Sequence, residues 1–472
     1  MNKKAAVVFY LLIILIFGAA IYNIIERGHA LEKTSTHFVK ASSSSPDNFQ
    51  LFSESLHNNF LHPLPVLLMQ IIVIVITARL FGFLFNKINQ PAVIGEIVAG
   101  IVLGPSVIGL FFPQFSHFVF PVSSLGNLQF LSQVGLVLFM FVIGMELDLS
   151  VVAKQAFGAV VISHASIIIP YTLGMGLAYF LYDAFAPANI SFLSFALFMG
   201  IAMSITAFPV LARIIQEKGL TKTKLGALAL TCAAADDVTA WCILAAVIAI
   251  VKAGSSVSAL YTIGIAICYV LIMLFIIKPL LKKLGNEYVE TETVKKSVMA
   301  FVFMLLLISA YVTEIIGIHA LFGAFLAGVV MPPQLNFRKM IIDKIEDVSI
   351  VLLLPLFFVF TGLRTQIGLL SNVHLWITCA WIIAIAVAGK FGGSALSAKV
   401  VGQSWKDSLS IGALMNTRGL MELIVLNIGY DLGILSPEIF AMLVLMALIT
   451  TFMTGPALDL INKFMADKKN DL

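Results

Sequence analysis

The chain has 472 residues, of which 60% are hydrophobic and only 11% are charged. Soluble domains carry roughly 25% charged residues, so a water-soluble fold is excluded. The net charge of +4 is no sign of a nucleic-acid partner, because a bias of basic residues between loops accounts for it. The cysteines lie inside apolar runs without paired spacing, and we expect them to pack as small core residues.

Long apolar runs without alternation predict helices rather than barrel strands, because backbone amides in lipid must be hydrogen-bonded within their own segment. A helix needs about 20 apolar residues to cross the hydrocarbon core. The sequence therefore predicts an all-α polytopic membrane protein. In chain order, the predicted spans cover residues 6-24, 65-86, 91-111, 127-146, 155-182, 190-215, 224-251, 257-283, 295-316, 319-333, 349-366, 375-399, 406-430 and 436-462.

Basic residues gather in the loops on one side if these fourteen spans alternate in direction. The loops 112-126, 183-189 and 431-435 on the other side contain no lysine or arginine. Loops rich in lysine and arginine stay in the cytoplasm. We therefore expect a multi-pass protein of the inner membrane with both termini in the cytoplasm.

The first apolar stretch is the least certain of the spans. It follows two lysines, so a cleaved signal peptide is the alternative to a retained helix at 1-25. Its length exceeds a usual signal core of roughly 7–15 residues, which favours the retained helix. We expect an outer polar loop at 26-62, a membrane domain at 63-463 and a cytoplasmic tail at 464-472.

Two segments are echoed later in the chain. The run GEIVAGIVLGP at 95-105 resembles HALFGAFLAGVVMP at 319-332, and FMFVIGMELDLS at 139-150 resembles FFVFTGLRTQIG at 357-368. Each echo lies seven spans after its counterpart, which reverses its orientation in the membrane. The sequence thus predicts inverted six-helix repeats, as in many secondary transporters. Chance similarity between glycine-rich apolar helices is the alternative.

Two aspartates lie where charge is expensive. The span ALTCAAADDVTAWCILAAV places Asp236 and Asp237 near its middle, and a charge there costs on the order of 2.5–3.5 kcal/mol on insertion scales. Adjacent helix positions point about 100° apart, so one carboxylate can face a cavity and the other a neighbouring helix. Two adjacent carboxylates in low dielectric resist joint ionisation. Such a pair can bind a hard cation or a proton, and a hydrated pair at a helix end is the alternative.

Three further positions belong with the aspartates. Lys390 falls in the opposite half of the predicted repeat, and we expect it to pair with one aspartate and leave the other for transport. Snorkelling of Lys390 to the membrane interface is the alternative. In span 190-215, Ser204 and Thr206 precede Pro209. Proline removes a backbone donor, which predicts a broken helix whose hydroxyls bind an ion or satisfy free carbonyls.

The span 406-430 also contains charge. Arg418 and Glu422 lie four residues apart on one helix face, a spacing that allows an ion pair. The sequence leaves open whether this pair is structural or functional.

Four motifs together resemble a known family. QPAVIGEIVAGIVLGPS at 90-106, SITAFPVLARI at 204-214, AADDVTAW at 234-241 and MNTRGLMELIVLNIG at 415-429 are similar, in this order, to motifs of the monovalent cation:proton antiporters with the sodium/hydrogen exchanger fold. The resemblance extends over most of residues 65-462. The last motif is similar to the plant and fungal cation/proton exchanger branch, and the double aspartate resembles bacterial sodium/proton antiporters.

The resemblance implies a thirteen-helix core with two crossed, interrupted helices, to which this chain adds one N-terminal helix, and a homodimer. It implies that Asp237 is the carboxylate that binds cation and proton, with Asp236 as its neighbour. Lys390 then corresponds to the lysine that pairs with the first aspartate. Ser204 and Thr206 are implied to lie beside the ion.

The predicted function is secondary active antiport of Na+ or K+ against protons by alternating access, without enzymatic activity or a cofactor. A gated potassium efflux pathway without proton coupling is the alternative. An intramembrane aspartyl protease is disfavoured, because its two aspartates must come from separate helices around one water. The double aspartate with Lys390 resembles electrogenic exchangers, whereas the motif at 415-429 resembles electroneutral ones, so the stoichiometry stays open.

Overall fold

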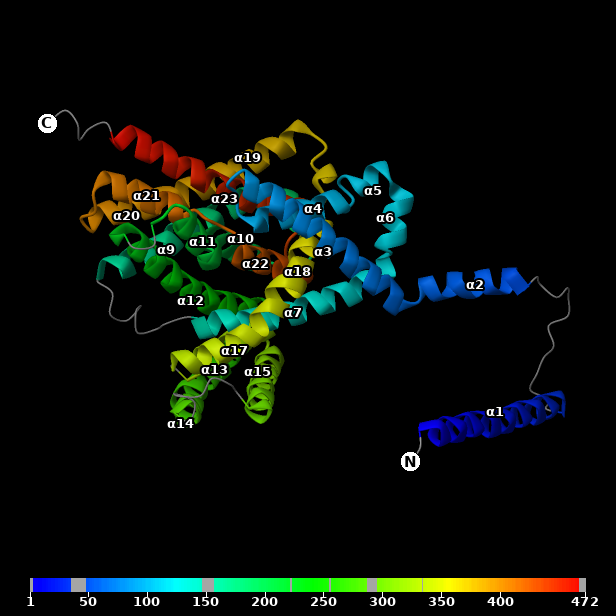
Figure 1. Ribbon diagram of the computed structural model, residues 1–472. Coiled ribbons are helices and arrows are strands. Elements are labelled where there is room, and N and C mark those ends of the chain that lie inside the picture. The colour runs from blue at the N-terminus through cyan, green and yellow to red at the C-terminus, as the bar shows by residue number, and fades with distance from the viewer. Residues whose placement is uncertain are drawn as a thin grey trace. The chain divides into compact units, whose positions relative to one another are not determined.

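The computed structural model describes residues 3–34, 48–146, 157–220, 223–253, 256–286, 295–332 and 334–466. All regular elements in these ranges are helices (Figure 1). The chain divides into two compact units, Met1–His62 and Pro63–Leu472. Part of the predicted loop 26-62 and most of the predicted tail 464-472 lie outside the described residues.

The first unit contains two helices. α1 (Lys3–Thr34) includes an apolar stretch, Phe9–Gly28, that is long enough to cross a membrane. α2 (Asn48–Leu61) forms where we expected part of a polar loop. Phenylalanine and leucine recur there every three or four residues (NFQLFSESLHNNFL), and this spacing gives a helix one apolar face.

The second unit is a bundle of helices. It contains α3 (Pro63–Lys87), α4 (Ala92–Leu103), α5 (Ile108–Phe111), α6 (Pro113–Val119), α7 (Leu125–Glu146), α9 (Phe157–Phe185), α10 (Phe192–Ser204), α11 (Phe208–Glu217), α12 (Lys224–Ala253), α13 (Ser256–Ile272), α14 (Lys278–Asn286), α15 (Lys296–Ile316), α16 (Ala320–Val329), α17 (Leu335–Val348), α18 (Leu354–Arg364), α19 (Val373–Val387), α20 (Gly393–Val400), α21 (Trp405–Met415), α22 (Leu420–Asp431) and α23 (Pro437–Ala466). π-helical turns at Met273–Ile277, Ser349–Leu353 and Ala388–Gly392 join α13 to α14, α17 to α18 and α19 to α20.

The number of full spans is smaller than the sequence suggested. In the described part of the chain, 11 helices are long and apolar enough to cross a membrane, or 12 if the bent pair α21–α22 is one span. The sequence predicts fourteen spans, and the two that do not form full spans are 190-215 and 319-333. The first is broken into α10 and α11, and the second is only the ten-residue helix α16.

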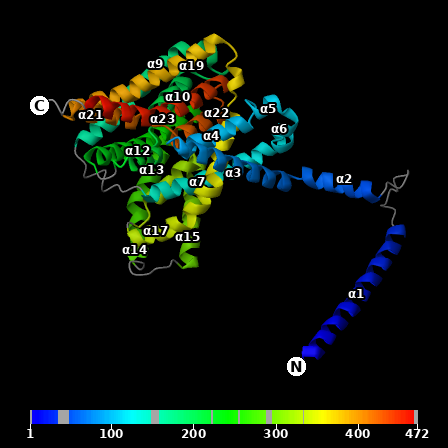
Figure 2. The same ribbon diagram turned by 45° about the horizontal axis from the view of Figure 1, so that its top comes forward.

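Most helices of the second unit pack in two groups. We call α9 to α12 and α19 to α23 the core group, because these helices pack on one another and surround α12. We call α3, α4, α7 and α15 to α18 the scaffold group, in which α4 packs on α18 and α7 packs on α16. Both views separate α9, α10 and α21 from α7 and α15 (Figures 1 and 2). Contacts between the groups are fewer than contacts within them.

Glycines allow two scaffold helices, α4 and α18, to touch backbone to backbone. A Cβ added to Gly100 would overlap the Val359 carbonyl oxygen, and a Cβ added to Gly362 would overlap the Ile97 carbonyl oxygen. Neither position can carry a side chain without separating the helices.

The pair α7 and α16 repeats this contact. A Cβ added to Gly144 would overlap the Phe325 carbonyl oxygen, and a Cβ added to Gly328 would overlap the Phe141 carbonyl oxygen. In the echoed sequences, Gly100 matches Gly328 and Gly144 matches Gly362. The contact between α7 and α16 is therefore the counterpart, in the second echo, of the contact between α4 and α18. A two-fold repeat produces this pattern. The opposite membrane orientation of the halves stays a prediction.

Two cysteines differ from the expectation of core packing. Cys232 and Cys379 are buried, but Cys242 and Cys268 are exposed. The prediction is wrong for these two, because an apolar run in a membrane helix faces lipid as readily as the protein interior.

Substitution of Gly144 by alanine tests the close approach of α7 and α16. We expect Gly144→Ala to destabilise the fold by about 1–3 kcal/mol, because the new methyl group meets backbone that cannot move aside. Gly126→Ala on the same helix is the matched control, since nothing lies within 4 Å of a Cβ there. Thermal unfolding of both variants in detergent measures the difference, and equal melting temperatures would contradict the packing.

Candidate functional site

The site is built around two interrupted helices of the core group. α10 and α11 are separated by residues 205–207, and α21 and α22 are separated by residues 416–419 with a bend of 41°. The break predicted before Pro209 is therefore present. The N–H of Ala207 donates to the Thr417 carbonyl oxygen at 3.0 Å, so the two interruptions lie against each other.

Positive side chains satisfy the last carbonyls of α10. Arg418 donates to the carbonyl oxygens of Ala202 at 2.7 Å and Met203 at 2.6 Å. Lys390 donates to the carbonyl oxygen of Ser204 at 2.5 Å. A helix end leaves carbonyls without partners and carries partial negative charge. The two cations therefore stabilise an interruption that would otherwise expose unpaired backbone inside the protein.

Asp236 of α12 is fully buried and accepts hydrogen bonds from three elements. The hydroxyls of Ser163 and Ser166 on α9 donate to it at 2.7 and 2.8 Å, and the hydroxyl of Thr206 donates at 2.8 Å. Lys390 completes the set with Nζ 2.9 Å from Oδ2. A buried carboxylate with a cation and three hydroxyl donors is well compensated in its charged form. Asp236 has little capacity left for a further ligand.

The hydrogen-bond donors of Lys390 are all engaged, as are the acceptors of Asp236. It lies in the π-helical turn Ala388–Gly392, and its side chain is buried. Besides Asp236, its ammonium group donates to the carbonyl oxygens of Ser166, at 2.9 Å, and Ser204. An ammonium group has three donors. Lys390 thus links α9, α10 and α12 through one charge.

Asp237 has different surroundings from its neighbour. Its side chain is 3% exposed, and the described residues offer no hydrogen-bond partner to its Oδ1 atom. The backbone of Phe208, at the start of α11, lies next to this side chain. An unsatisfied buried acceptor costs about 1–3 kcal/mol, and more when it is charged. Among the described residues, Asp237 therefore keeps an acceptor oxygen without a partner, which Asp236 does not.

The two hydroxyls predicted beside the ion are engaged within the protein. Ser204 donates to the Ile201 carbonyl oxygen at 3.0 Å. Thr206 contacts Asp236 and the Met415 carbonyl oxygen at 3.1 Å. Both hydroxyls are buried at the end of α10 and keep their oxygen lone pairs as acceptors.

Arg418 and Glu422 form an ion pair of 2.7 Å with both side chains fully buried. Arg418 Nε and Glu422 Oε1 have no hydrogen-bond partner in the described part of the chain. The backbone N–H of Arg418 donates to Thr451 of α23 at 3.0 Å. The pair therefore holds the start of α22 against α10 and α23.

The interface between the core group and the scaffold group encloses a large cavity at one end. A cavity of about 500 Å³ is lined by α7, α11, α17 and α18, with Glu146 and Glu346 among its side chains. Phe208, whose backbone lies next to Asp237, also lines this cavity.

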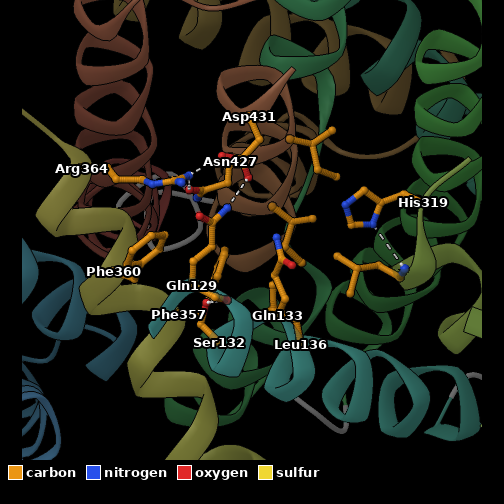
Figure 3. Close-up of a pocket in the computed structure, with 13 residues that line it drawn as sticks. Gln129, Ser132, Gln133, Leu136, His319, Phe357, Phe360, Arg364, Asn427 and Asp431 are labelled. Carbon is orange, nitrogen blue, oxygen red and sulfur yellow. Dashed lines mark hydrogen bonds and ion pairs between the residues drawn. The ribbon is translucent and has the colours of Figure 1, made fainter. Parts of the chain in front are cut away.

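The other end of the same interface, which we call the closed end, encloses much less space. A pocket of about 30 Å³ lies there, lined by Gln129, His319, Arg364, Asn427 and Asp431 (Figure 3). α7 runs past both spaces, because residues 129–136 line the small pocket and residues 139–146 line the large cavity. The two ends of this interface therefore enclose spaces of very different volume.

The sequence does not predict Ser163 or Ser166 as site residues, and it suggests only a role as a buried, hydrogen-bonded polar residue for Ser166. Their spacing of three places both on one face of α9 in an otherwise apolar stretch. This pattern indicates that both hydroxyls face the same neighbour, but it does not identify that neighbour as Asp236 of α12, which is 70 residues later in the sequence than Ser166.

Comparison with known proteins gives the family. Residues 72–462 match the family described as sodium/hydrogen exchanger, transmembrane. The chain belongs to this family of multi-pass membrane transporters. The resemblance predicted from the four sequence motifs is thus confirmed.

Several relatives share much of this sequence. The Na+/H+ antiporter NhaS4 of Synechocystis sp. is 43% identical over 392 residues, which are 83% of this chain and 96% of that protein. Cation/H+ antiporter 17 of Arabidopsis thaliana is 41% identical over 84% of this chain, and the K+/H+ antiporter 1 of Saccharomyces cerevisiae is 34% identical over 86%. The matched region is 48% of the plant protein and 47% of the yeast protein, so the chain spans about half their length.

A solved structure shares the fold. The sodium proton antiporter MjNhaP1 of Methanocaldococcus jannaschii superposes with a TM-score of 0.60 at 14% sequence identity. The match covers 85% of this chain and 98% of that protein. The predicted all-helical antiporter fold is therefore confirmed.

The buried pair of Asp236 and Lys390 gives a stability prediction. We expect Lys390→Ala to cost about 3–5 kcal/mol, because it leaves a buried carboxylate without its cation. The double variant Asp236→Asn/Lys390→Met is expected to recover much of this loss, since it removes both charges. Thermal unfolding measures both variants.

The matched control for this pair is Lys218→Ala. Lys218 pairs with Asp459 at 2.7 Å, but their side chains are 31% and 64% exposed, and such pairs contribute about 0–1 kcal/mol. Equal losses in Lys390→Ala and Lys218→Ala would contradict the assigned role of the buried pair.

Proposed function

We propose that this chain is a secondary active antiporter that exchanges a monovalent cation, Na+ or K+, for protons by alternating access. The observation that carries the proposal is Asp237, a buried carboxylate with an oxygen that has no partner among the described residues. Its neighbour Asp236 is fully bonded. Cation and proton therefore compete for Asp237 alone.

The buried charges around Asp237 explain why exchange is coupled. Asp236 is paired with Lys390, and Arg418 is paired with Glu422. Among the described residues of this cluster, Asp237 is then the buried acid without a basic partner of its own. An uncompensated charge is costly in low dielectric, so the site is stable when Asp237 carries a proton or a cation. An empty, charged site would rarely change sides, which prevents uncoupled leakage.

The chemistry of the site suits a hard monovalent cation. The helix interruption offers carboxylate, hydroxyl and backbone carbonyl oxygens, and hard cations prefer oxygen ligands. Asp237 would supply the charge, while Ser204 and Thr206 would supply neutral oxygens as hydration is lost. The names of the relatives support cation:proton exchange and include both Na+ and K+ as the cation.

We further propose how the protein lies in the membrane. The closed end of the interface includes Asp431, which is in the predicted outer loop 431-435 that lacks basic residues. The large cavity would then face the cytoplasm, with both termini on that side in the inner membrane. Residues 63-463 would form the transport domain, and two copies would form the dimer that the family resemblance implies.

Replacement of Asp237 tests the transport proposal. Purified protein is reconstituted in liposomes with a pH-sensitive dye inside, and Na+, K+ or Li+ is added outside in turn. We expect the native protein to move protons in response to the transported cation. Asp237→Asn is expected to lower the rate by at least about 100-fold, because the amide can carry neither a proton nor a compensating charge. The cation that gives the response is the physiological substrate class.

The same liposome assay measures a control variant and tests the alternative function of gated potassium efflux. Asp459→Asn removes an exposed acid of the core group and should transport at the native rate. Potassium movement without proton movement would instead support the gated efflux pathway. Native transport by Asp237→Asn would contradict the assignment of the site.

A further inference from the structure

One ion pair joins the core group to the scaffold group at the closed end of their interface. Arg364, the last residue of α18, lies 2.7 Å from Asp431, the last residue of α22. The other ion pairs described above, which involve Lys218, Lys390 and Arg418, each lie within the core group. The Arg364–Asp431 pair is thus placed to connect parts that alternating access requires to move.

The guanidinium group of Arg364 is held in a defined orientation. It lies 4.4 Å from the centre of the Phe360 ring and 5.4 Å from the centre of the Tyr430 ring. It also donates to Asn427 Oδ1 at 3.3 Å. Stacking on aromatic rings reduces the freedom of the side chain and shields its charge. The pair is therefore better ordered than an ion pair between two mobile surface side chains.

Amide side chains add two more links at the same end, and Figure 3 draws the one between Gln129 and Asp431. Gln129 of α7 donates to Asp431 Oδ2 at 3.1 Å. Asn427 of α22 donates to Thr361 of α18 at 2.8 Å. α22 is therefore bonded to two of the scaffold helices that line the small pocket, whose volume is only about 30 Å³.

We propose that Arg364 and Asp431, with Gln129, form a latch that keeps this end of the interface closed and that breaks whenever the site opens to this side. The proposal rests on the alternating-access function proposed above. Arg364 and Asp431 are positioning residues in this account, because neither contacts Asp237. The strength of the latch then sets the balance between the two states, since a contact made in one state alone shifts the population toward it.

The latch is tested by access of a thiol reagent to the small pocket. Ser132 is 1% exposed and lines this pocket, so Ser132→Cys places a small reporter there. The exposed Cys242 and Cys268 are first replaced by serine. The full chain is then treated in liposomes with a charged, membrane-impermeant thiol reagent, and the modification rate is measured.

Removal of either charge should open the pocket more often. We expect Arg364→Gln and Asp431→Asn each to raise the modification rate by roughly three- to tenfold over the reporter background. The double variant should be no faster than the faster single variant, because the two residues act as one unit. Arg364→Lys keeps the charge and should stay closest to the background rate.

A second ion pair supplies the matched control. Lys218 and Asp459 are also 2.7 Å apart, but both belong to the core group. Lys218→Gln and Asp459→Asn should therefore leave the reporter rate unchanged. All variants are first shown to be monodisperse by size-exclusion chromatography.

The outcomes separate this proposal from the transport proposal. Background rates in both Arg364→Gln and Asp431→Asn would overturn the latch, whatever the transport assay gives. Additive effects in the double variant would overturn the paired action of the two residues. If the rates rise as expected while the native protein moves no protons, the latch stands and the proposed exchange is wrong.

Discussion

The buried contact between Lys390 and Asp236 is the constraint on which the rest of the site depends. Lys390 reaches from a π-helical turn and bonds to Asp236 and to carbonyl oxygens on α9 and α10. A single buried charge of this kind would cost several kcal/mol. Paired and fully hydrogen-bonded, it instead fixes where three helices meet and satisfies the broken end of α10. Together with Arg418, this ion pair therefore stabilises the interruption that forms the site.

The same constraint separates the roles of two adjacent carboxylates. Asp236 points to α9 and Lys390 and has its partners within the protein. Asp237 points to the start of α11, beside the large cavity, and keeps an oxygen without a partner among the described residues. Identical side chains in neighbouring positions thus have opposite capacities for a ligand. The helical rotation of about 100° between them produces this division.

Around this rigid centre, the interface with the scaffold group differs between its ends. The scaffold is held by direct backbone contacts at Gly100, Gly144, Gly328 and Gly362, which leave little freedom for its helices to shift against one another. Motion is then easiest between the groups, where contacts are fewer. One end of that interface encloses about 500 Å³ and the other about 30 Å³. Polar bonds from Arg364, Gln129 and Asn427 concentrate at the closed end.

The sequence by itself determined the helical membrane class, the family and the residues that carry buried charge. The length of an apolar segment and the high energy of a charge in lipid are local properties, so the sequence alone identifies Asp236, Asp237 and Lys390 as unusual. Pro209 is identified in the same way, because proline removes a backbone donor from its own helix. The sequence could not determine which aspartate is saturated, because Ser163 and Ser166 reach Asp236 from a separate helix. It also overestimated the number of full spans, since α16 and the broken α10 are supported by packing rather than by length. Only the tertiary structure decided these points and brought Arg364 to Asp431, because contacts between helices distant in the chain leave no periodic signal in either segment.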